Sequence, residues 1–270
     1  MSQQTEKFIQ VSKEAATMAG KFLMDNFGKL NPEDVEEKAE NSFVTFVDKE
    51  SEKIIIDHIA KNFPNHSIIA EESGESEVKS DYAWFIDPLD GTTNFIQNLP
   101  LFSISIAVRT NKRIISGVVF NPVLQEMFSA ADGEGAFLND MPISLNSDPN
   151  IKRAVIATGF PHRIKRFLPK YLMALQEILL QCSGIRRWGS AALDLCYTAC
   201  GRYNCYWELG VSPWDVAAGS LIVQEAGGLV TDFWGKENFL DNGFIIAGSK
   251  QIHLKVQEIL SFHFKQPKAI

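Results

Sequence analysis

Residues 84–95 read Trp-Phe-Ile-Asp-Pro-Leu-Asp-Gly-Thr-Thr-Asn-Phe. The apolar run that begins at residue 82 stops at Asp87, which predicts a buried strand that ends in an acid. Pro88 has no backbone N–H, so we expect the strand to end there. Asp90 follows three residues after Asp87, beside Gly91, at a predicted tight turn. Two carboxylates on one rigid turn predict a site for a hard divalent cation such as Mg²⁺, whereas an Asx-type turn would explain only one of them.

The overall composition indicates a globular protein and argues against non-specific nucleic-acid binding. The 270 residues are 45% hydrophobic and 22% charged, which is enough for a full core in one large domain or two small ones. The formal net charge is −7, from 26 basic and 33 acidic residues. Non-specific nucleic-acid binding requires a basic face, so we expect no nucleic-acid partner.

No segment predicts export or membrane insertion. The first residues lack a basic region followed by an apolar stretch, and no apolar run reaches the length that spans a bilayer. The four cysteines fit neither a disulfide framework nor a Cys-x-x-Cys metal site, so we expect reduced thiols in the core. These features predict a cytoplasmic protein with no membrane partner.

Hydrophobic periodicity divides the chain into two predicted subdomains. Within residues 1–145, two helices precede a series of strands with short connections, which is typical of a largely antiparallel sheet flanked by helices. The polar segment 31–42 is predicted to be a loop. Strands and helices alternate within residues 146–270, which predicts an α/β arrangement. The predicted fold therefore combines an N-terminal α+β subdomain with a C-terminal α/β subdomain.

Three further acidic positions each allow a structural and a functional interpretation. Thr45 and Asp48 have the spacing of a capping box, in which Asp48 only starts a helix. Glu71 follows a short apolar run, and an exposed turn is the commoner explanation of such an acid. Asp215 opens a predicted helix, where an N-cap is as reasonable as a metal ligand. The residues alone leave these alternatives open.

Several segments, taken in chain order, resemble the motifs of a known family. They are Ala-Glu-Glu-Ser at 70–73, Ile-Asp-Pro-Leu-Asp-Gly-Thr-Thr-Asn-Phe at 86–95, Trp-Gly-Ser-Ala-Ala at 188–192, Ser-Pro-Trp-Asp-Val-Ala-Ala-Gly at 212–219 and Glu-Ala-Gly-Gly at 225–228. The ordered set resembles the inositol monophosphatases over nearly the whole chain. It is similar to bacterial members of this superfamily of Mg²⁺-dependent, lithium-sensitive phosphatases. The resemblance implies a layered αβαβα sandwich, shared with fructose-1,6-bisphosphatases, and a homodimer.

The resemblance also implies a site for two to three Mg²⁺ ions. One ion is expected on Glu71, Asp87 and the carbonyl of Leu89. A second is expected on Asp87, Asp90 and Asp215, with Asp87 as the bridge. A third, weaker ion is expected on Glu71.

Catalytic and substrate-binding roles follow from the same resemblance. Asp48 and Thr92, near Glu71, are expected to orient the attacking water. The expected substrate-binding residues are Gly91, Thr92, Gly189, Ser190, Ala191, Glu208 and Asp215. Glu208 is similar to a glutamate that binds inositol hydroxyls, although a polar residue that closes a strand is the plain alternative.

The activity implied by the resemblance is hydrolysis of a small phosphorylated metabolite, myo-inositol 1-phosphate, to inositol and phosphate by a metal-activated water. The 2′-phosphate of NADP, fructose 1,6-bisphosphate and 3′(2′),5′-bisphosphate nucleotides are alternative substrates, and a metal or metabolite sensor is the non-enzymatic alternative. Arg186 and Arg187 either contact a second phosphate or, as we expect, are solvated in a helix connection. The five histidines are expected to be surface or structural residues. A haloacid-dehalogenase-type phosphatase is rejected because Asp87 and Asp90 stand three residues apart rather than two.

Overall fold

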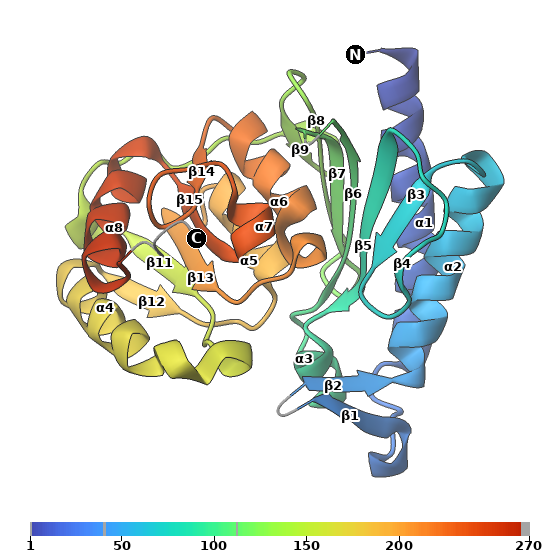
Figure 1. The fold of residues 1–270 in the computed structure, drawn as a ribbon, viewed down its shortest axis with the longest axis horizontal. Helices are drawn as coiled ribbons and strands as arrows, with labels where there is room; N and C mark the ends of the chain where they lie inside the picture. The colour runs from blue at the N-terminus through green and yellow to red at the C-terminus, as the bar shows by residue number, and fades with distance from the viewer. Residues whose placement is uncertain (1, 40–41, 112, 266–270) are drawn as a thin grey trace.

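Two large β-sheets and the helices that cover them form five layers (Figure 1). The computed structural model describes residues 2–39, 42–111 and 113–265. The layers follow one another as a helix pair, an eight-stranded sheet, a second helix pair, a five-stranded sheet and an outer helix pair. This arrangement confirms the predicted αβαβα sandwich.

The eight-stranded sheet has the strand order β10-β9-β8-β7-β6-β5-β3-β4. Its strands are β3 (Ser67–Ala70), β4 (Gly74–Glu75), β5 (Tyr82–Asp90), β6 (Ser103–Thr110), β7 (Arg113–Asn121), β8 (Glu126–Ala131), β9 (Ala136–Leu138) and β10 (Met141–Pro142). Strands β3 and β5 run parallel, and the other neighbouring pairs are antiparallel. Because parallel strands end at the same sheet edge, the residues that follow β3 lie beside the carboxyl end of β5.

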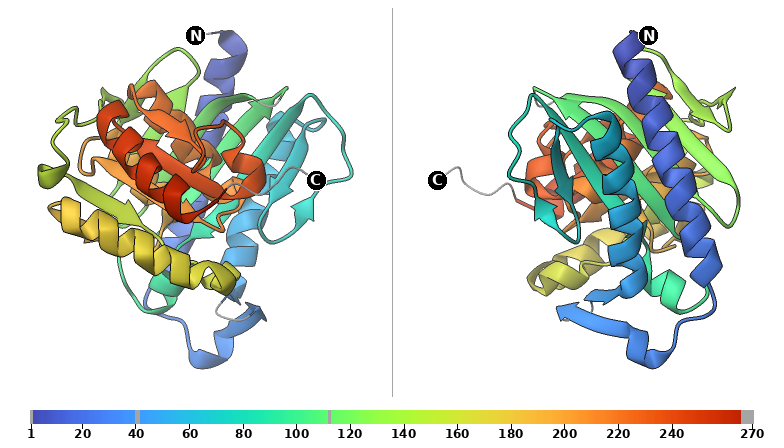
Figure 2. Two further views of the ribbon diagram at one scale, coloured as in Figure 1. Left: turned by 60° about the vertical axis from the view of Figure 1, so that its left-hand side comes forward. Right: turned by 90° about the vertical axis from the view of Figure 1, so that its right-hand side faces the viewer.

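Helices α1 (Gln3–Asn26) and α2 (Phe46–Asn62) cover the outer face of this sheet (Figure 2, right). The buried residues of α1 recur at three- and four-residue intervals, and they include Phe8, Val11, Ala15, Ala19 and Leu23. These side chains share one hydrophobic cluster with apolar residues of β5, β6 and β7. The amphipathic pattern of the sequence therefore determines which face of the helix meets the sheet.

The five-stranded sheet has the order β12-β11-β13-β15-β14, in which β12, β11 and β13 are parallel and β15 is antiparallel to both of its neighbours. Its strands are β11 (Val155–Thr158), β12 (Gly184–Arg186), β13 (Cys205–Leu209), β14 (Leu229–Thr231) and β15 (Phe244–Gly248). Helices α5 (Ala191–Ala199) and α6 (Pro213–Glu225) lie between the sheets, whereas α4 (Leu168–Gln181) and α8 (Lys250–His263) cover the outside. The short helices are α3 (Thr92–Ile96), α7 (Phe239–Asn242) and the 3₁₀ turns η1 (Pro32–Asp34), η2 (Ile151–Arg153) and η3 (His162–Phe167).

Two local predictions differ from the structure. The predicted loop at 31–42 contains β1 (Val35–Ala39), which pairs with β2 (Ser42–Thr45) as an antiparallel ribbon; residues 40 and 41 lie outside the described part. A two-stranded ribbon buries little surface, so it carries no apolar alternation that the sequence could reveal. The strand predicted to stop at Asp87 instead reaches Asp90. An irregularity between Asp87 and Asp90 in the pairing with β6 places Pro88 where no ladder hydrogen bond is required.

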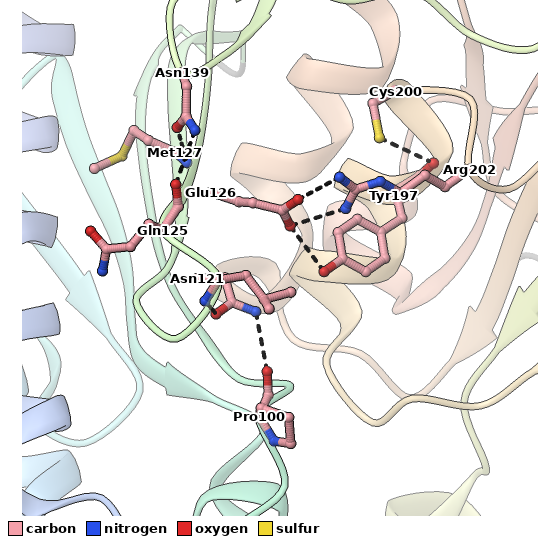
Figure 3. Close-up of polar contacts among 10 residues, drawn as sticks. Pro100, Asn121, Gln125, Glu126, Met127, Asn139, Tyr197, Cys200 and Arg202 are labelled. Atoms are coloured by element: carbon pink, nitrogen blue, oxygen red, sulfur yellow. Dashed lines mark hydrogen bonds and ion pairs between the residues drawn. The ribbon is translucent and has the colours of Figure 1, made fainter.

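A polar contact joins the eight-stranded sheet to the helix layer behind it (Figure 3). Glu126, at the start of β8, accepts hydrogen bonds from Arg202 Nη1 at 3.0 Å and from the Tyr197 hydroxyl at 3.1 Å. Arg202 Nη2 donates to the other carboxylate oxygen, which makes the ion pair bidentate. The hydrophobic cluster between the sheets likewise combines side chains from both halves of the chain. Because the two predicted subdomains, 1–145 and 146–270, share this core, the boundary between them stays a proposal.

The predictions that no segment spans a membrane and that the cysteines are reduced can be compared with the described residues. None of the helices in that part of the chain is both long and apolar enough to cross a membrane. All four cysteines are free thiols, and Cys196 and Cys205 are buried. The expectation of reduced cysteines agrees with this arrangement.

The packing of α6 on β7 gives a test of the sandwich. A β-carbon at Gly117 would lie 2.8 Å from the carbonyl oxygen and 2.9 Å from the Cα of Ala218. Because backbone cannot rotate away, Gly117→Ala should lower the free energy of unfolding by about 1–3 kcal/mol, measured by urea denaturation. Gly184→Ala is the control, since only the flexible end of Arg186 lies near, at 3.2 Å. Equal stability of the two variants would contradict the close packing of α6.

Candidate metal and substrate site

Three carboxylates from distant parts of the chain meet between the two large sheets. Oxygen atoms of Glu71, Asp87 and Asp215 lie within 4.8 Å of one another. Glu71 follows β3, Asp87 belongs to the neighbouring parallel strand β5, and Asp215 lies in the first turn of α6. The parallel pairing of β3 and β5 places the first two together, and the packing of α6 on the sheet brings the third.

The surroundings of these carboxylates make their negative charges unfavourable. Asp87 is 1% exposed and Asp215 is 8% exposed. Burial raises the pKa of Asp87 well above its usual range, and the negative charges of Glu71, Asp90 and Asp215 raise it further. Crowded carboxylate oxygens in a shielded position are the donor set that Mg²⁺ prefers. The residues therefore fit the predicted cation.

The two remaining predicted ligands, Leu89 and Asp90, line the same cavity. Asp90 Oδ2 accepts hydrogen bonds from Ser190 Oγ at 2.6 Å and from the backbone N–H of Ala192 at 2.8 Å. Burial outweighs these contacts and raises the pKa of Asp90 to about 6. The backbone N–H of Leu89 donates to Asp87 Oδ1 at 3.0 Å, which fixes the turn between the two acids. The assignment of individual ligands to individual ions stays a prediction.

Asp48 caps a helix and also contacts a residue of the cavity, and its catalytic role stays a prediction. Its Oδ2 accepts hydrogen bonds from the backbone N–H and the hydroxyl of Thr45, each at 2.7 Å, in the capping box of α2. Its Oδ1 accepts a hydrogen bond from Thr92 Oγ1 at 2.9 Å. Thr92 lines the cavity, whereas Asp48 lies behind it and is 1% exposed. The helix cap and the contact to the site therefore coexist in one carboxylate.

Helix α2 also holds the metal-site turns through two residues that we did not predict. Ser51 Oγ donates to the carbonyl oxygen of Pro88 at 2.9 Å. The Glu52 carboxylate accepts the backbone N–H groups of Glu72 at 2.8 Å and Ser73 at 2.9 Å, directly after Glu71. Glu52 is 3% exposed. The available signal was helical spacing, because Glu52 shares a face with buried apolar residues of α2.

A cavity of about 480 Å³ opens from the acidic cluster. The predicted site residues that line it are Glu71, Asp87, Leu89, Asp90, Gly91, Thr92, Gly189, Ser190, Ala191, Glu208 and Asp215. Further lining residues that were not predicted as site residues are Phe43, Thr93, Gly159, Phe160, His162, Arg187, Asp194, Leu209, Gly210 and Val211. Arg187 is exposed in the connection before α5, as expected, but it also lines the cavity, and so does His162. Both come from connections whose course the sequence pattern does not determine.

Two glycines allow the backbone to pass close to this cavity. Gly91 and Gly189 have φ values of +96° and +86°, which favour glycine. A β-carbon at Gly91 would lie 3.0 Å from the carbonyl oxygen of Leu101. The Asn94 side-chain amide donates to the carbonyls of Leu101 at 2.6 Å and Trp188 at 2.7 Å, and so fastens α3 to the segment before α5.

Glu208 forms part of the cavity wall near the end of β13. Its Oε2 accepts a hydrogen bond from the Tyr206 hydroxyl at 2.8 Å. Burial raises the pKa of Glu208 to about 7. A β-carbon at Gly159 would lie 2.1 Å from the Glu208 carboxyl oxygens, so any larger residue there would displace the Glu208 carboxyl from this position. Ser190 caps α5 by accepting the backbone N–H of Leu193 at 3.3 Å, in addition to its contact with Asp90.

Comparisons with known proteins agree with this geometry. Residues 4–264 match the family model described as the inositol monophosphatase family. A relative from Pasteurella multocida (strain Pm70), named Nus factor SuhB, is 44% identical over 263 residues, which make up 96% of this chain and 98% of the relative. The crystal structure of extragenic suppressor protein suhB from Bartonella henselae matches with a TM-score of 0.90 at 39% identity, over 94% of this chain and 98% of that one. The structure of inositol monophosphatase from Anabaena (Nostoc) sp. PCC 7120 matches with a TM-score of 0.85 at 37% identity, over 95% and 96% of the two chains.

The contact between Glu52 and the turn after Glu71 gives a test of the metal site. In Glu52→Gln, an amide N–H₂ would face one of the two backbone donors, so the turn should lose its position. We expect the Mg²⁺ dissociation constant to rise about tenfold or more, as for other residues that orient metal ligands, measured by titration calorimetry. Glu50→Gln is the matched control, because this side chain on the same helix is 51% exposed. An unchanged dissociation constant in Glu52→Gln would show that Glu52 stabilises only the turn.

Proposed function

This chain belongs to the inositol monophosphatase family, and from that membership we propose that it is a Mg²⁺-dependent phosphomonoesterase that hydrolyses a polyol monophosphate such as myo-inositol 1-phosphate. The observation that carries the proposal is the convergence of Glu71, Asp87 and Asp215 within 4.8 Å. Such a buried acidic cluster destabilises the protein by itself, which is expected of a site kept for a cation.

The metal roles that we propose are those expected from the sequence. Glu71, Asp87 and the Leu89 carbonyl would hold one ion, and Asp87, Asp90 and Asp215 a second, with a weaker third on Glu71. When bound, Mg²⁺ supplies positive charge that offsets the negative charge developing on the phosphate and lowers the pKa of a water. The carboxylates must be ionised to bind it, so metal binding would release any proton that their raised pKa values retain.

The chain itself would position the reactants. Thr92 lines the cavity, and its hydroxyl donates a hydrogen bond to Asp48, so its oxygen would be free to accept a hydrogen bond from the attacking water. The backbone N–H groups of Gly91 and Thr92 begin α3, where we propose that they face the phosphate. Gly189, Ser190 and Ala191 would contact the substrate through their backbone, and Glu208 would bind its hydroxyls.

A substrate with a second anionic group is the second candidate. Arg187 lines the cavity and lies 5.3 Å from the centre of the Phe160 ring, which also lines it. A guanidinium beside an exposed aromatic ring can bind a phosphate and a planar base, which favours the 2′-phosphate of NADP or a bisphosphate nucleotide. A phosphate-release panel with inositol 1-phosphate, fructose 1,6-bisphosphate, NADP and adenosine bisphosphate decides between the candidates.

The remaining expectations stay part of the proposal. We propose a cytoplasmic homodimer that is inhibited by lithium after product forms and that binds no nucleic acid. Some curated relatives are named as Nus factors rather than as phosphatases, so a non-enzymatic role is the alternative. The complete set of predicted ligand acids in the cavity favours the enzyme.

Removal of the metal tests the phosphatase itself. Phosphate release should stop in EDTA and recover with excess Mg²⁺. Asp215→Asn should lose turnover, because it removes a charged ligand of the proposed metal site. Its circular-dichroism spectrum should be unchanged, because asparagine has the same shape as aspartate. Asp57→Asn, an exposed aspartate on α2, is the control and should keep wild-type activity. Full activity in metal-free buffer would refute the proposal.

The pair formed by Asp48 and Thr92 tests the orientation of the water. Asp48→Asn and Thr92→Ala should each lower kcat by about 100-fold or more with a nearly normal KM. The double variant should cost little more than either single change, because both residues serve one water. Thr45→Ala is the control: it removes the cap of α2, at a cost of about 1 kcal/mol, but keeps the contact between Asp48 and Thr92. If Asp48→Asn lowered Tm like Thr45→Ala and kept kcat, Asp48 would be only a cap.

A further inference from the structure

Asp194 is a buried acid in the cavity wall to which neither the fold nor the proposed mechanism gives a role. It lies in the first turn of α5, is 1% exposed, and lines the cavity beside Glu208 and Asp90. Its Oδ1 is fully buried and has no hydrogen-bond partner among the described residues. Ser190 and Tyr206 do not supply one, because their hydroxyls donate to Asp90 and Glu208.

No hydrogen bond at Oδ1 offsets the cost of burying this carboxyl. Its neighbours in the helix, Leu193, Leu195 and Cys196, are buried apolar or weakly polar residues. A buried polar atom without a partner destabilises the native state, whereas an apolar group of similar shape would not. Residues that break such a packing rule are found mainly at functional sites.

The charges around Asp194 define what it can bind. Burial raises its pKa well above the usual range, the negative charges of Glu208 and Asp90 raise it further, and Arg187 opposes them. A phosphate would be repelled by this group of acids. A hydroxyl suits the position in either protonation state, because it can donate to a carboxylate or accept from a carboxylic acid.

We propose that Asp194 is a substrate-selecting residue that hydrogen-bonds a hydroxyl of the polyol part of the substrate, next to the hydroxyl bound by Glu208. The inference rests on the proposed function and deepens it. Two carboxyl groups on one wall recognise adjacent hydroxyls, so the substrate class is a cyclitol or sugar phosphate with neighbouring free hydroxyls. A phosphate ester without hydroxyls would gain nothing from Asp194.

The test compares two substrates in the Mg²⁺-loaded enzyme. Asp194→Leu, which has a similar shape but no polar atom, should lower kcat/KM for inositol 1-phosphate at least tenfold, mainly through KM. The same variant should hydrolyse p-nitrophenyl phosphate within twofold of the wild type and should have a higher Tm. Asp194→Asn keeps a donor and an acceptor, so it should retain more inositol phosphate hydrolysis than Asp194→Leu. Asp194→Ala adds no atoms and replaces Asp194→Leu if the latter does not fold.

A control variant tests whether the effect is specific to Asp194, and a double variant tests whether Asp194 and Glu208 bind different hydroxyls. Asp232→Asn changes an equally buried aspartate, 1% exposed, outside the lining of the cavity, and should leave the ratio of the two activities unchanged. If Asp194 and Glu208 bind different hydroxyls, the double variant should lose more inositol phosphate hydrolysis than either single variant, without the losses having to multiply, because the two neighbouring acids also interact. A double variant no worse than Glu208→Gln, or equal losses on both substrates, would overturn the proposal. A wild type that hydrolyses neither ester would instead refute the proposed phosphatase.

Discussion

Repulsion among buried carboxylates is the constraint on which the rest of this structure depends. At separations of no more than 4.8 Å, each pair of negative charges would repel by at least roughly 3 kcal/mol if the effective dielectric constant is about 20. Helix α2 resists this force, because Ser51 holds the carbonyl of Pro88 and Glu52 holds the turn after Glu71. The same helix also packs its apolar residues Val47, Ile55 and Ile59 into the hydrophobic cluster on the sheet. The hydrophobic core thus supplies the stability that the acidic cluster removes.

The layered architecture follows from where these charges must meet. Asp87 can reach Glu71 because β3 and β5 are parallel within an otherwise antiparallel sheet. Asp215 joins them only if α6 lies directly on β7, and Gly117 permits that approach. The bidentate contact between Glu126 and Arg202 ties the same two layers together at another point (Figure 3). The site is therefore a property of the interface between the sheets, and neither half of the chain contains it alone.

The sequence predicts the parts of this arrangement that have a local signature. The apolar run before Asp87 and the glycine after Asp90 indicate a strand and a turn, and the αβαβα layers follow from the family resemblance. Glu52 escaped prediction because helical spacing shows only that it is buried, whereas what it binds is a backbone N–H twenty residues away. Asp194 escaped because an acid in the first turn of a helix is normally a favourable dipole contact. Only the packed cavity shows that the carboxyl is shielded and that its Oδ1 has no hydrogen-bond partner in the described part of the chain.

Arg187 connects the two substrate classes and helps to rank them. Its positive charge lowers the pKa of both Glu208 and Asp194, opposing the larger effect of burial. The guanidinium therefore already compensates acids of the cavity wall, and binding a second phosphate would withdraw that compensation. A polyol imposes no such cost, because its hydroxyls can pair with the carboxyl groups while Arg187 keeps its place. The electrostatic balance of the cavity thus supports the proposed polyol monophosphate over the second candidate, a bisphosphate.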